Sequence, residues 1–562
     1  MPPLNTLFSA TALPPSVQSL QAQQQRSATA MPATDSYGTG IAQPGPSAPP
    51  PPPTPSEPVA ADAFIFQKPF SPTPNPVSLD GLQLKSSIVG RLLGKHRVAG
   101  MPATELAVVL GRNASETSDQ RVAMFANLYN ALGDEGQERL LSLAKRGVLS
   151  NDTAENNHST LYQCYALLNT PRAEGLDAQR LLEELVFHLD KPTSITQQMT
   201  PISQQSAQLM LAAGTQEQQV LPNGKTIGHA LNWASVHPEI SHSCVAASVM
   251  VYMAEKTPSE LARHVQELTS PQLAFYETVK WQDIASTRDE ALETLKALRA
   301  PYQQLNADTF RLRVDMSPTA HVRTYNDNHA RSVNLNVPSN PFSPRTRTSV
   351  ETAYQSALLY LGSQHTFSAA NDGRILNGQF RYGLTDAEKT VMESIVKDNG
   401  GVAQVNYQIT AGLNDVPAEQ NNTPYLYGYT RTFQQTTQDI LNALGQKEFV
   451  IAGISYPDDE GAIPGGHEFT ITSAYVDPNT NDLMFVTIDT DDAMDTPVPV
   501  AARTLIPEIH HLGMPKKLGE TINKEIEALP NGYFVPNRMD AQQFDPIPVT
   551  HKPIPPDVFI PE

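Results

Sequence analysis

Cysteine is scarce in this chain of 562 residues, which has only Cys164 and Cys244, in unrelated sequence contexts. Two such cysteines predict no disulfide framework and are compatible with a reducing compartment. No run reaches about 18 uninterrupted apolar residues, so no membrane span is expected. Residues 1–30 lack a basic stretch followed by an apolar one, so no Sec-type signal peptide is predicted. The location is left open between the cytoplasm and export by a signal-less route.

Runs of basic residues are also missing, and the formal net charge is −19. Nucleic acids and anionic membrane surfaces need clusters of Lys and Arg, so neither is an expected partner. No Cys, His or Glu spacing typical of zinc is present, and neither a metal nor another cofactor is predicted. Asp477-x-Asn479-x-Asn481 is similar to the start of a calcium loop, but Ile488 stands where the loop needs a Glu, so a turn is predicted. The oligomeric state is left open.

Changes in composition and periodicity divide the chain into four segments. Residues 1–80 contain 18 of the 48 prolines together with Ser, Thr and Gln, which predicts a disordered segment. Residues 81–220 place apolar residues three and four apart between Gly and Pro breaks, which predicts an all-helical domain. Residues 221–500 contain helical patterns and, from about residue 309, strand patterns, and they form the third segment. Residues 501–562 are expected to be a Pro-rich C-terminal extension.

Alternating and continuous apolar runs predict strands in the second half of the chain. Thr309–Asp315 alternates, Glu448–Tyr456 is almost entirely apolar, and His467–Val476 and Leu483–Asp489 flank a six-residue turn. A helical run is predicted from Leu273 to Leu298. Strands and helices that are mostly segregated in this way indicate an α+β fold.

Cys244 is the first candidate functional residue. It follows the polar, Pro-broken loop before Ser241 and begins an apolar segment rich in small residues, which predicts a buried helix with the thiol in its first turn. Free backbone N–H groups and the helix dipole favour the thiolate there, and the thiolate is the nucleophilic form. The alternative is a structural cysteine without chemistry, because free cysteines are often buried.

A thiol nucleophile needs a base and a group that orients the base. The predicted hairpin supplies both, because His467 begins one strand after Gly465-Gly466 and an acidic cluster ends the other. An unbulged register puts His467 opposite Asp492, whereas a shift of one residue brings Asp489 or Asp491 onto the face of His467. Asp489 is preferred because it adjoins the apolar strand.

These residues resemble the papain-like cysteine peptidases, and most closely a bacterial branch similar to the peptidases that process bacteriocin leaders after a double glycine. The resemblance covers Trp233–Leu268 and Gln434–Asp495, under a third of the chain. It implies a core in which a helix-start cysteine packs on an antiparallel sheet that carries the histidine and the aspartate. It assigns the catalytic triad to Cys244, His467 and Asp489. It also implies that residues 221–500 are the catalytic domain, with an insertion at about 300–430.

The chain departs from that family at two positions. The family has Gln or a similar donor about six residues before the cysteine, where this chain has Pro238, and it usually has Gly where Val245 stands. Asn232, Ser241 or the backbone N–H of Cys244 would then have to form the oxyanion hole.

The function that the resemblance implies is cysteine-dependent hydrolysis of a peptide or amide bond through a thioester, with a protein or peptide as substrate. Two alternatives stay open. One is an acyl transferase of the transglutaminase or deamidase type. The other is an inactive papain-like scaffold that acts as an interaction protein.

Overall fold

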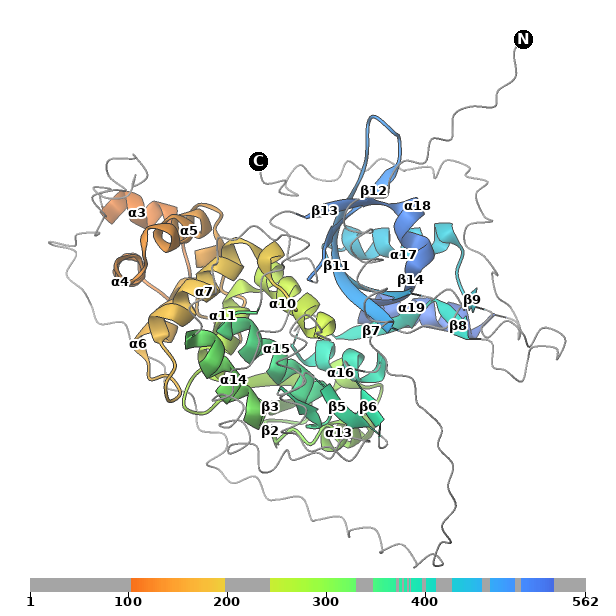
Figure 1. Cartoon of the computed structure of the whole chain (residues 1–562), viewed down its shortest axis with the longest axis horizontal. Helices are drawn as coiled ribbons and strands as arrows, with labels where there is room; N and C mark the ends of the chain where they lie inside the picture. Colours follow the sequence, from red (N-terminus) through yellow and green to blue (C-terminus); the bar gives the residue numbers. More distant parts are fainter. Residues whose placement is uncertain are drawn as a thin grey trace, which may run out of the picture. The chain divides into compact units, whose positions relative to one another are not determined.

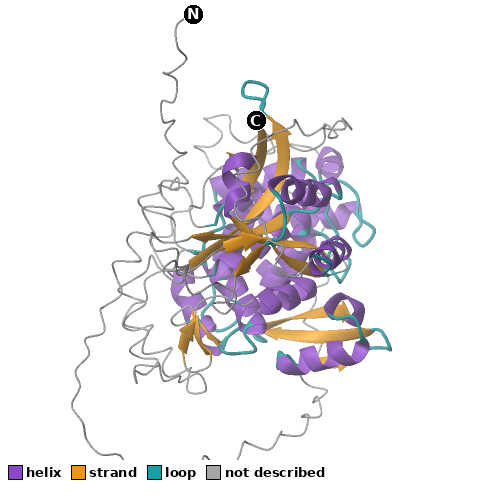
Figure 2. Cartoon of the chain, turned by 90° about the vertical axis from the view of Figure 1, so that its right-hand side faces the viewer, coloured by secondary structure: helices purple, strands orange, loops and turns teal. Residues whose placement is uncertain are grey.

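The structure is a computed structural model of the whole chain, and it describes most of residues 103–529. The described ranges are 103–197, 243–329, 347–369, 373–376, 379–381, 384, 386–396, 401–410, 427–456, 465–490 and 497–529. The predicted disordered segment at 1–80 lies outside them. Within the described ranges the protein is an α+β fold, as predicted, with helices and antiparallel sheets (Figures 1 and 2).

The described part of the predicted helical domain is all-helical. Three of its helices begin at residues that cap them: the side-chain oxygens of Thr117, Ser159 and Asp177 accept hydrogen bonds from backbone N–H groups of the first turns of α4, α6 and α7. The elements are α3 (Ala103–Val109), α4 (Ser118–Ala131), α5 (Asp134–Lys145), η1 (Val148–Ser150), α6 (Thr160–Asn169), α7 (Ala178–Asp190) and η2 (Pro192–Ser194).

This helical layer does not have a core of its own. One cluster of buried apolar residues joins Phe125 of α4 and Leu185 of α7 to Met250 of α10 (Cys244–Lys256), Val265 of α11 (Pro258–Leu268) and Leu358 of α15 (Ser349–Gly362). The helices before and after residue 220 are therefore one folding unit rather than separate domains.

A small sheet follows α11 and corrects one expectation. The segment predicted as a helix from Leu273 to Leu298 begins with a strand, β1 (Ala274–Lys280), which pairs with β3 (Thr309–Asp315). Aromatic and β-branched residues at Phe275, Tyr276 and Val279 favour a strand, and the longer helix of this segment starts only at the capping box of Thr287. The remaining elements here are α12 (Trp281–Ile284), α13 (Arg288–Ala297), β2 (Tyr302–Gln304) and α14 (Pro318–His329).

Several short elements lie between α15 and the last third of the chain. They are β4 (Phe367–Ser368), β5 (Gly373–Leu376) and β6 (Gln379–Arg381), which form one sheet, α16 (Asp386–Val396), β7 (Val402–Asn406), and the paired β8 (Gln408–Thr410) and β9 (Tyr427–Tyr429).

The largest sheet has six strands in the order β13-β12-β11-β10-β14-β7. Its strands are β7, β10 (Val450–Tyr456), β11 (Gly465–Val476), β12 (Leu483–Ile488), β13 (Val498–Ala501) and β14 (Ile509–Pro515), with α17 (Phe433–Gly445), α18 (Ala502–Leu505), η4 (Ile506–Glu508) and α19 (Lys516–Glu527) beside them. The predicted strands that became β10, β11 and β12 are confirmed. The β11–β12 hairpin projects beyond the other strands (Figures 1 and 2).

The two faces of this sheet pack on different cores. Ile451 and Ile488 point toward α10 and belong to the cluster shared with the helical layer. Phe469, Ile471 and Leu512 point the other way, into a second cluster formed with α17, α18 and η4. Figure 1 shows α10 and α17 on opposite sides of β11.

The sheet also shows that the predicted domain limits at 300–430 and at 500 do not coincide with structural limits. Strand β14 comes from the segment expected to be a Pro-rich extension, yet it lies between β10 and β7. Strand β7 comes from the expected insertion and forms the edge of the same sheet. Both segments are parts of the sheet that carries His467. Within the described ranges, no helix has the length and apolar content that crossing a membrane requires.

Candidate active site

Cys244 is the first residue of α10, as the sequence predicts, and it is only partly buried. Ser243 is the N-cap residue, but its hydroxyl makes no capping hydrogen bond with the helix. The first N–H groups of a helix have no partner within the helix, so this end of α10 presents partial positive charge beside the thiol.

The other cysteine provides a contrast. Cys164 lies in α6, is 0 % exposed, and packs in the apolar core shared by the helices. Burial raises the pKa of its thiol to about 12. Because thiolate is the reactive form, Cys164 should be inert in the folded protein and Cys244 should be the reactive cysteine.

His467 and Asp489 are joined by a hydrogen bond of 2.6 Å between Nε2 and Oδ1. The contact depends on a bulge in β11: Ser473 pairs with Val486, but Ile471 pairs with Thr487, so the register shifts by one residue. This is the shift that brings Asp489 onto the face of His467. Both side chains are largely buried, with 7 % and 15 % of their surfaces exposed.

Helix α10 lies directly on β11. The Ser248 hydroxyl donates to the backbone oxygen of Glu468, and the Thr470 hydroxyl donates to the backbone oxygen of Ser248, both at 3.3 Å. In a helix the side chain tilts toward the N-terminus and the carbonyl points toward the C-terminus, so α10 and β11 run in roughly the same direction. One helical turn before Ser248, about 5–6 Å back, the start of α10 lies near Gly466 of the strand.

Side-chain alternation places the imidazole and the thiol on different faces of β11. Glu468 and Thr470 point toward α10, whereas His467 points with Phe469 toward the second core. No hydrogen bond joins the Cys244 thiol to His467 in the described part of the chain. The two groups can meet only around the beginning of the strand, where Gly465-Gly466 has no side chains in the way.

A chain of buried hydrogen bonds connects the start of α10 to the end of β12. The Ser243 hydroxyl donates to Gln355 Oε1 (2.8 Å), and Gln355 Nε2 donates to the backbone oxygen of Thr196 (2.9 Å). The next N–H, that of Gln197, donates to the backbone oxygen of Thr490 (3.0 Å). Ser243 and Thr490 adjoin Cys244 and Asp489, so the chain ties together the segments that carry two of the three predicted catalytic residues.

The remaining predicted site residues lie outside the described residues. These are the oxyanion candidates Asn232 and Ser241 and the alternative acids Asp491 and Asp492.

A buried polar cluster beside the site was missed by the sequence analysis. Glu468 forms an ion pair with Lys389 of α16 and accepts a hydrogen bond from His511 of β14 at 2.9 Å. Gly453 pairs with both Glu468 and His511 and lies under the imidazole, since a Cβ there would be 1.9 Å from the ring. Burial opposes ionisation of Glu468, but Lys389 and His511 outweigh it and lower the pKa of this carboxyl. The signal in the sequence was a Glu and a Gly within apolar strands.

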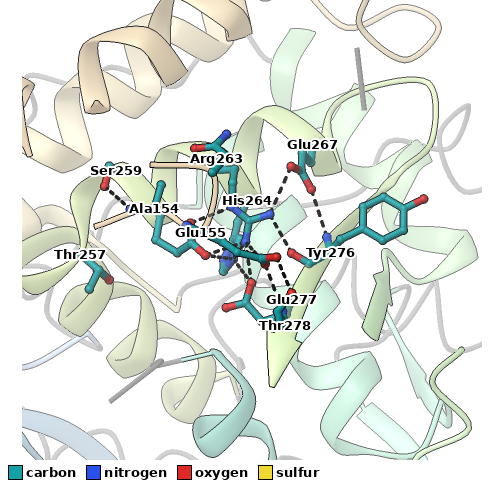
Figure 3. Close-up of polar contacts among 12 residues, drawn as sticks. Ala154, Glu155, Thr257, Ser259, Arg263, His264, Glu267, Tyr276, Glu277 and Thr278 are labelled. Atoms are coloured by element: carbon teal, nitrogen blue, oxygen red, sulfur yellow. Dashed lines mark hydrogen bonds and ion pairs between the residues drawn. The ribbon is translucent and has the colours of Figure 1, made fainter. Parts of the chain in front are cut away.

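A second buried cluster gathers charges from α11 and β1 (Figure 3). Arg263 donates from Nη2 to Glu260 (2.6 Å) and Glu277 (2.5 Å) and from Nη1 to Glu267 (3.2 Å). His264 Nε2 lies 3.2 Å from Glu277. All five side chains are at most 6 % exposed. Glu155 adds a partly exposed carboxylate 3.7 Å from Arg263.

Glu260, His264 and Glu277 offer atoms close enough together to ligate a cation. The guanidinium of Arg263, however, already contacts all three of these side chains, and Nη2 lies 3.1 Å from His264 Nε2. A metal ion would have to displace this positive charge. The cluster therefore fits a structural role in which Arg263 takes the place of a metal ion.

The cluster holds protons that isolated side chains would release. Burial opposes protonation of His264, but the charges of Glu277 and Glu260 and the hydrogen bonds with them outweigh burial and raise the pKa of His264 to about 9. Burial, and then the charge of Glu260, raise the pKa of Glu277. Burial would raise the pKa of Glu260 too, but Arg263 outweighs it and lowers that pKa.

Comparisons of the chain with protein-family models, with curated proteins and with solved structures found no match. The fold and the site geometry are therefore the only basis for assigning a function.

Proposed function

We propose that this protein is a cysteine-dependent hydrolase of peptide or amide bonds with a papain-like core. Cys244 is the nucleophile, His467 is the general base and then the general acid, and Asp489 orients the imidazole. The observation that carries the proposal is the 2.6 Å hydrogen bond between His467 and Asp489, in a hairpin on which the Cys244 helix packs.

The polarity of this hydrogen bond fits the role. A neutral imidazole has one N–H, and a carboxylate can only accept, so Asp489 favours the tautomer with the proton on Nε2 of His467. Nδ1 then has the lone pair that takes the thiol proton. The carboxylate also stabilises the imidazolium that forms.

The reaction proceeds in two halves. The Cys244 sulfur bonds to the substrate carbonyl carbon, and collapse of the tetrahedral intermediate breaks the C–N bond as His467 returns its proton to the leaving amine. Water, deprotonated by His467, then attacks the thioester and releases the acid and the thiol. An amine in place of water gives the acyl transfer of a transglutaminase. The N–H groups at the start of α10 are positioned to stabilise the oxyanion.

A second candidate function is that of a non-catalytic interaction scaffold. It is favoured by the position of His467 on the face of β11 opposite to α10. In the scaffold, Cys244 is an ordinary helix-start thiol and the His467–Asp489 pair only stabilises the hairpin.

A thiol-directed probe with a peptide-like electrophile, such as an epoxysuccinyl amide, separates the two candidates. The hydrolase predicts native labelling at Cys244 that disappears in Cys244→Ala and falls at least about tenfold in His467→Ala, because general-base catalysis contributes 10²–10⁴-fold. Cys164→Ala is the matched control and should label like the wild type. Equal labelling of wild type and His467→Ala would support the scaffold instead.

A further inference from the structure

Strand β7 forms one edge of the six-stranded sheet, and side chains of neighbouring helices close it. The hydroxyl of Ser394 in α16 accepts from the backbone N–H of Val402 at 3.0 Å and donates to the backbone oxygen of the same residue at 3.3 Å. Nδ2 of Asn523 in α19 donates to the backbone oxygen of Gln404 at 3.0 Å. These contacts occupy backbone groups that an added strand would need.

Two other sheet edges are also protected. In β1 of the small sheet, the backbone N–H of Tyr276 donates to Glu267 at 3.0 Å, and its backbone oxygen accepts from Arg263 at 2.7 Å. Strand β13, the other edge of the large sheet, contains Pro499, which has no N–H to offer. Side chains or a proline thus limit strand addition at each of these three edges.

The second half of β11 has an edge without such protection. Strand β10 pairs with β11 only as far as Ile471, whereas β12 pairs with it as far as Val476. On the side of β10, residues 473–476 therefore have no neighbouring strand among the described residues. They belong to the hairpin that projects beyond the rest of the sheet (Figures 1 and 2). We call residues 473–476 on this side the β11 edge.

The hydrogen-bond pattern of the hairpin shows which groups point outward from the β11 edge. The Asp477 N–H donates to the Asp482 oxygen at 2.9 Å, so these two residues form a hydrogen-bonded pair. Hydrogen-bonded and non-bonded pairs alternate along an antiparallel ladder. Val476 and Ala474 are therefore in non-bonded pairs with β12, and their N–H and C=O groups point away from it. Within the described residues no hydrogen bond reaches these groups.

The β11 edge is complementary to itself. In an antiparallel pair of two copies centred on Tyr475, Ala474 lies opposite Val476 of the second copy, and the two residues exchange both of their outward hydrogen bonds. The twofold axis repeats this pair. Tyr475 lies opposite Tyr475 of the second copy, which is a favourable aromatic pair. Ser473 lies opposite Asp477 of the second copy, so no like charges face each other.

The charges around the β11 edge also fit a second copy. In this pairing the added strand continues the line of β10, so its acidic turn, with Asp477 and Asp482, reaches the residues that precede Val450. Lys447 is exposed there. The other charged residue next to it, Glu448, is engaged by a hydrogen bond of 2.8 Å from the Tyr252 hydroxyl. The contact therefore brings carboxylates of each copy near a lysine of the other.

We propose that the β11 edge docks a second copy of this chain, which adds its own β11 edge in antiparallel orientation across a twofold axis. Such an interface is isologous, because the same residues contribute from both copies. It joins the two large sheets into one by strand addition. The contact surface is small, so the dimer is weak and reversible. The proposal does not depend on the proposed hydrolase activity.

Sedimentation velocity of the full-length protein over a range of concentrations tests the proposal. The wild type should show a reversible monomer–dimer equilibrium. Ala474→Pro removes an outward N–H from each copy but no hydrogen bond to β12, and loss of two hydrogen bonds should raise the dissociation constant about 5- to 140-fold. A monomeric wild type would overturn the proposal and leave the edge to a strand of another protein.

Ala501→Pro is the matched control. Ala501 is in β13, on the opposite side of the hairpin, and its φ of −64° already fits proline. This variant should have the dissociation constant of the wild type. Equal dissociation constants for Ala474→Pro and Ala501→Pro would refute the β11 edge as the interface.

A charge swap at Tyr475 tests the twofold register and does not depend on whether Ala474→Pro folds. Tyr475 is 41 % exposed, so charged substitutions are tolerated there. Tyr475→Glu and Tyr475→Lys each place like charges opposite each other on the axis, and each protein alone should be monomeric. An equimolar mixture of the two should dimerise again. If either variant alone dimerises like the wild type, or if the mixture stays monomeric, the proposed pairing is wrong.

Discussion

Arg263→Met should strongly destabilise the protein, because it removes the only positive charge that contacts Glu260, Glu267 and Glu277 together within the described residues. Met has nearly the length of the Arg stem, so the change mainly deletes charge and hydrogen-bond donors. The carboxylates are at most 6 % exposed and cannot be solvated in place. The structure thus predicts uncompensated buried negative charge rather than a cavity.

Breaking a buried ion pair by removing one partner costs about 3–5 kcal/mol. Arg263 contacts three carboxylates and also donates to the Tyr276 carbonyl at 2.7 Å, so this range is a lower estimate. Protonation of a carboxyl offsets part of the cost, and Glu277, whose pKa is already raised, is the group expected to take up the proton. At roughly 2 °C per kcal/mol for a large domain, the melting temperature should fall by about 6 °C or more.

Urea unfolding followed by circular dichroism at neutral pH measures the change. Arg263→Lys, which keeps the charge but loses the forked geometry, should fall between wild type and Arg263→Met. Lys296→Met, which breaks the exposed pair with Glu293, should leave the midpoint unchanged. A loss below about 1 kcal/mol for Arg263→Met, the size of a surface pair, would refute the account of this cluster.

Two further predictions concern pH and a glycine. In the folded protein the pKa of His264 is about 9, above the ordinary 6.5, and the pKa of Glu277 is also raised. Both groups bind protons more tightly in the folded than in the unfolded state, so they stabilise the folded protein at low pH and this contribution is lost as the pH rises. Urea midpoints should therefore fall between pH about 6.5 and 9, and fall less in His264→Gln; a midpoint that rises over this window would contradict the assignment. Gly453→Ala places a Cβ 1.9 Å from the His511 ring and should lower the free energy of unfolding in urea by about 1–3 kcal/mol. The control Gly445→Ala, with no atom within 4 Å of the new Cβ, should be neutral or stabilising. Equal midpoints for the two variants would refute the packing of His511 over Gly453.

The strands of the β11–β12 hairpin could be predicted because their signals, apolar runs and turn residues, lie within a few neighbouring residues of the sequence. They did not predict that β14 and β7 join the same sheet, since Ile509–Pro515 contains two histidines, a glycine and a proline, and its apolar content is low for a strand between two others. Strand pairing across a long separation in the chain has no local signature. The Leu273–Leu298 prediction was wrong at its start because a run of apolar residues fits either a strand or a buried helix.

The site was predictable where it depends on residue type and chain order, and not where it depends on tertiary contacts. The sequence allowed the one-residue register shift that brings Asp489 to His467, but it did not favour that register over the unbulged one. No residue near Ser473 is of a type that requires a bulge. Glu260, Arg263, His264 and Glu267 share one helical face, a pattern typical of a solvent-exposed surface, and only the packing of β1 buries it. The hydrogen bond between Gln355 and Ser243 had no signal either, because it joins residues more than a hundred positions apart in the chain.

The proposed hydrolase mechanism requires the Cys244 thiol and the His467 imidazole to meet around the start of β11. Dibromoacetone, which alkylates a thiol with one end and a nearby imidazole with the other, tests this directly in folded Cys164→Ala protein. Mass spectrometry of the digest should show the peptides that contain Cys244 and His467 joined by one acetone bridge. Modification of Cys244 alone, with the second bromide lost to water, would contradict the claim.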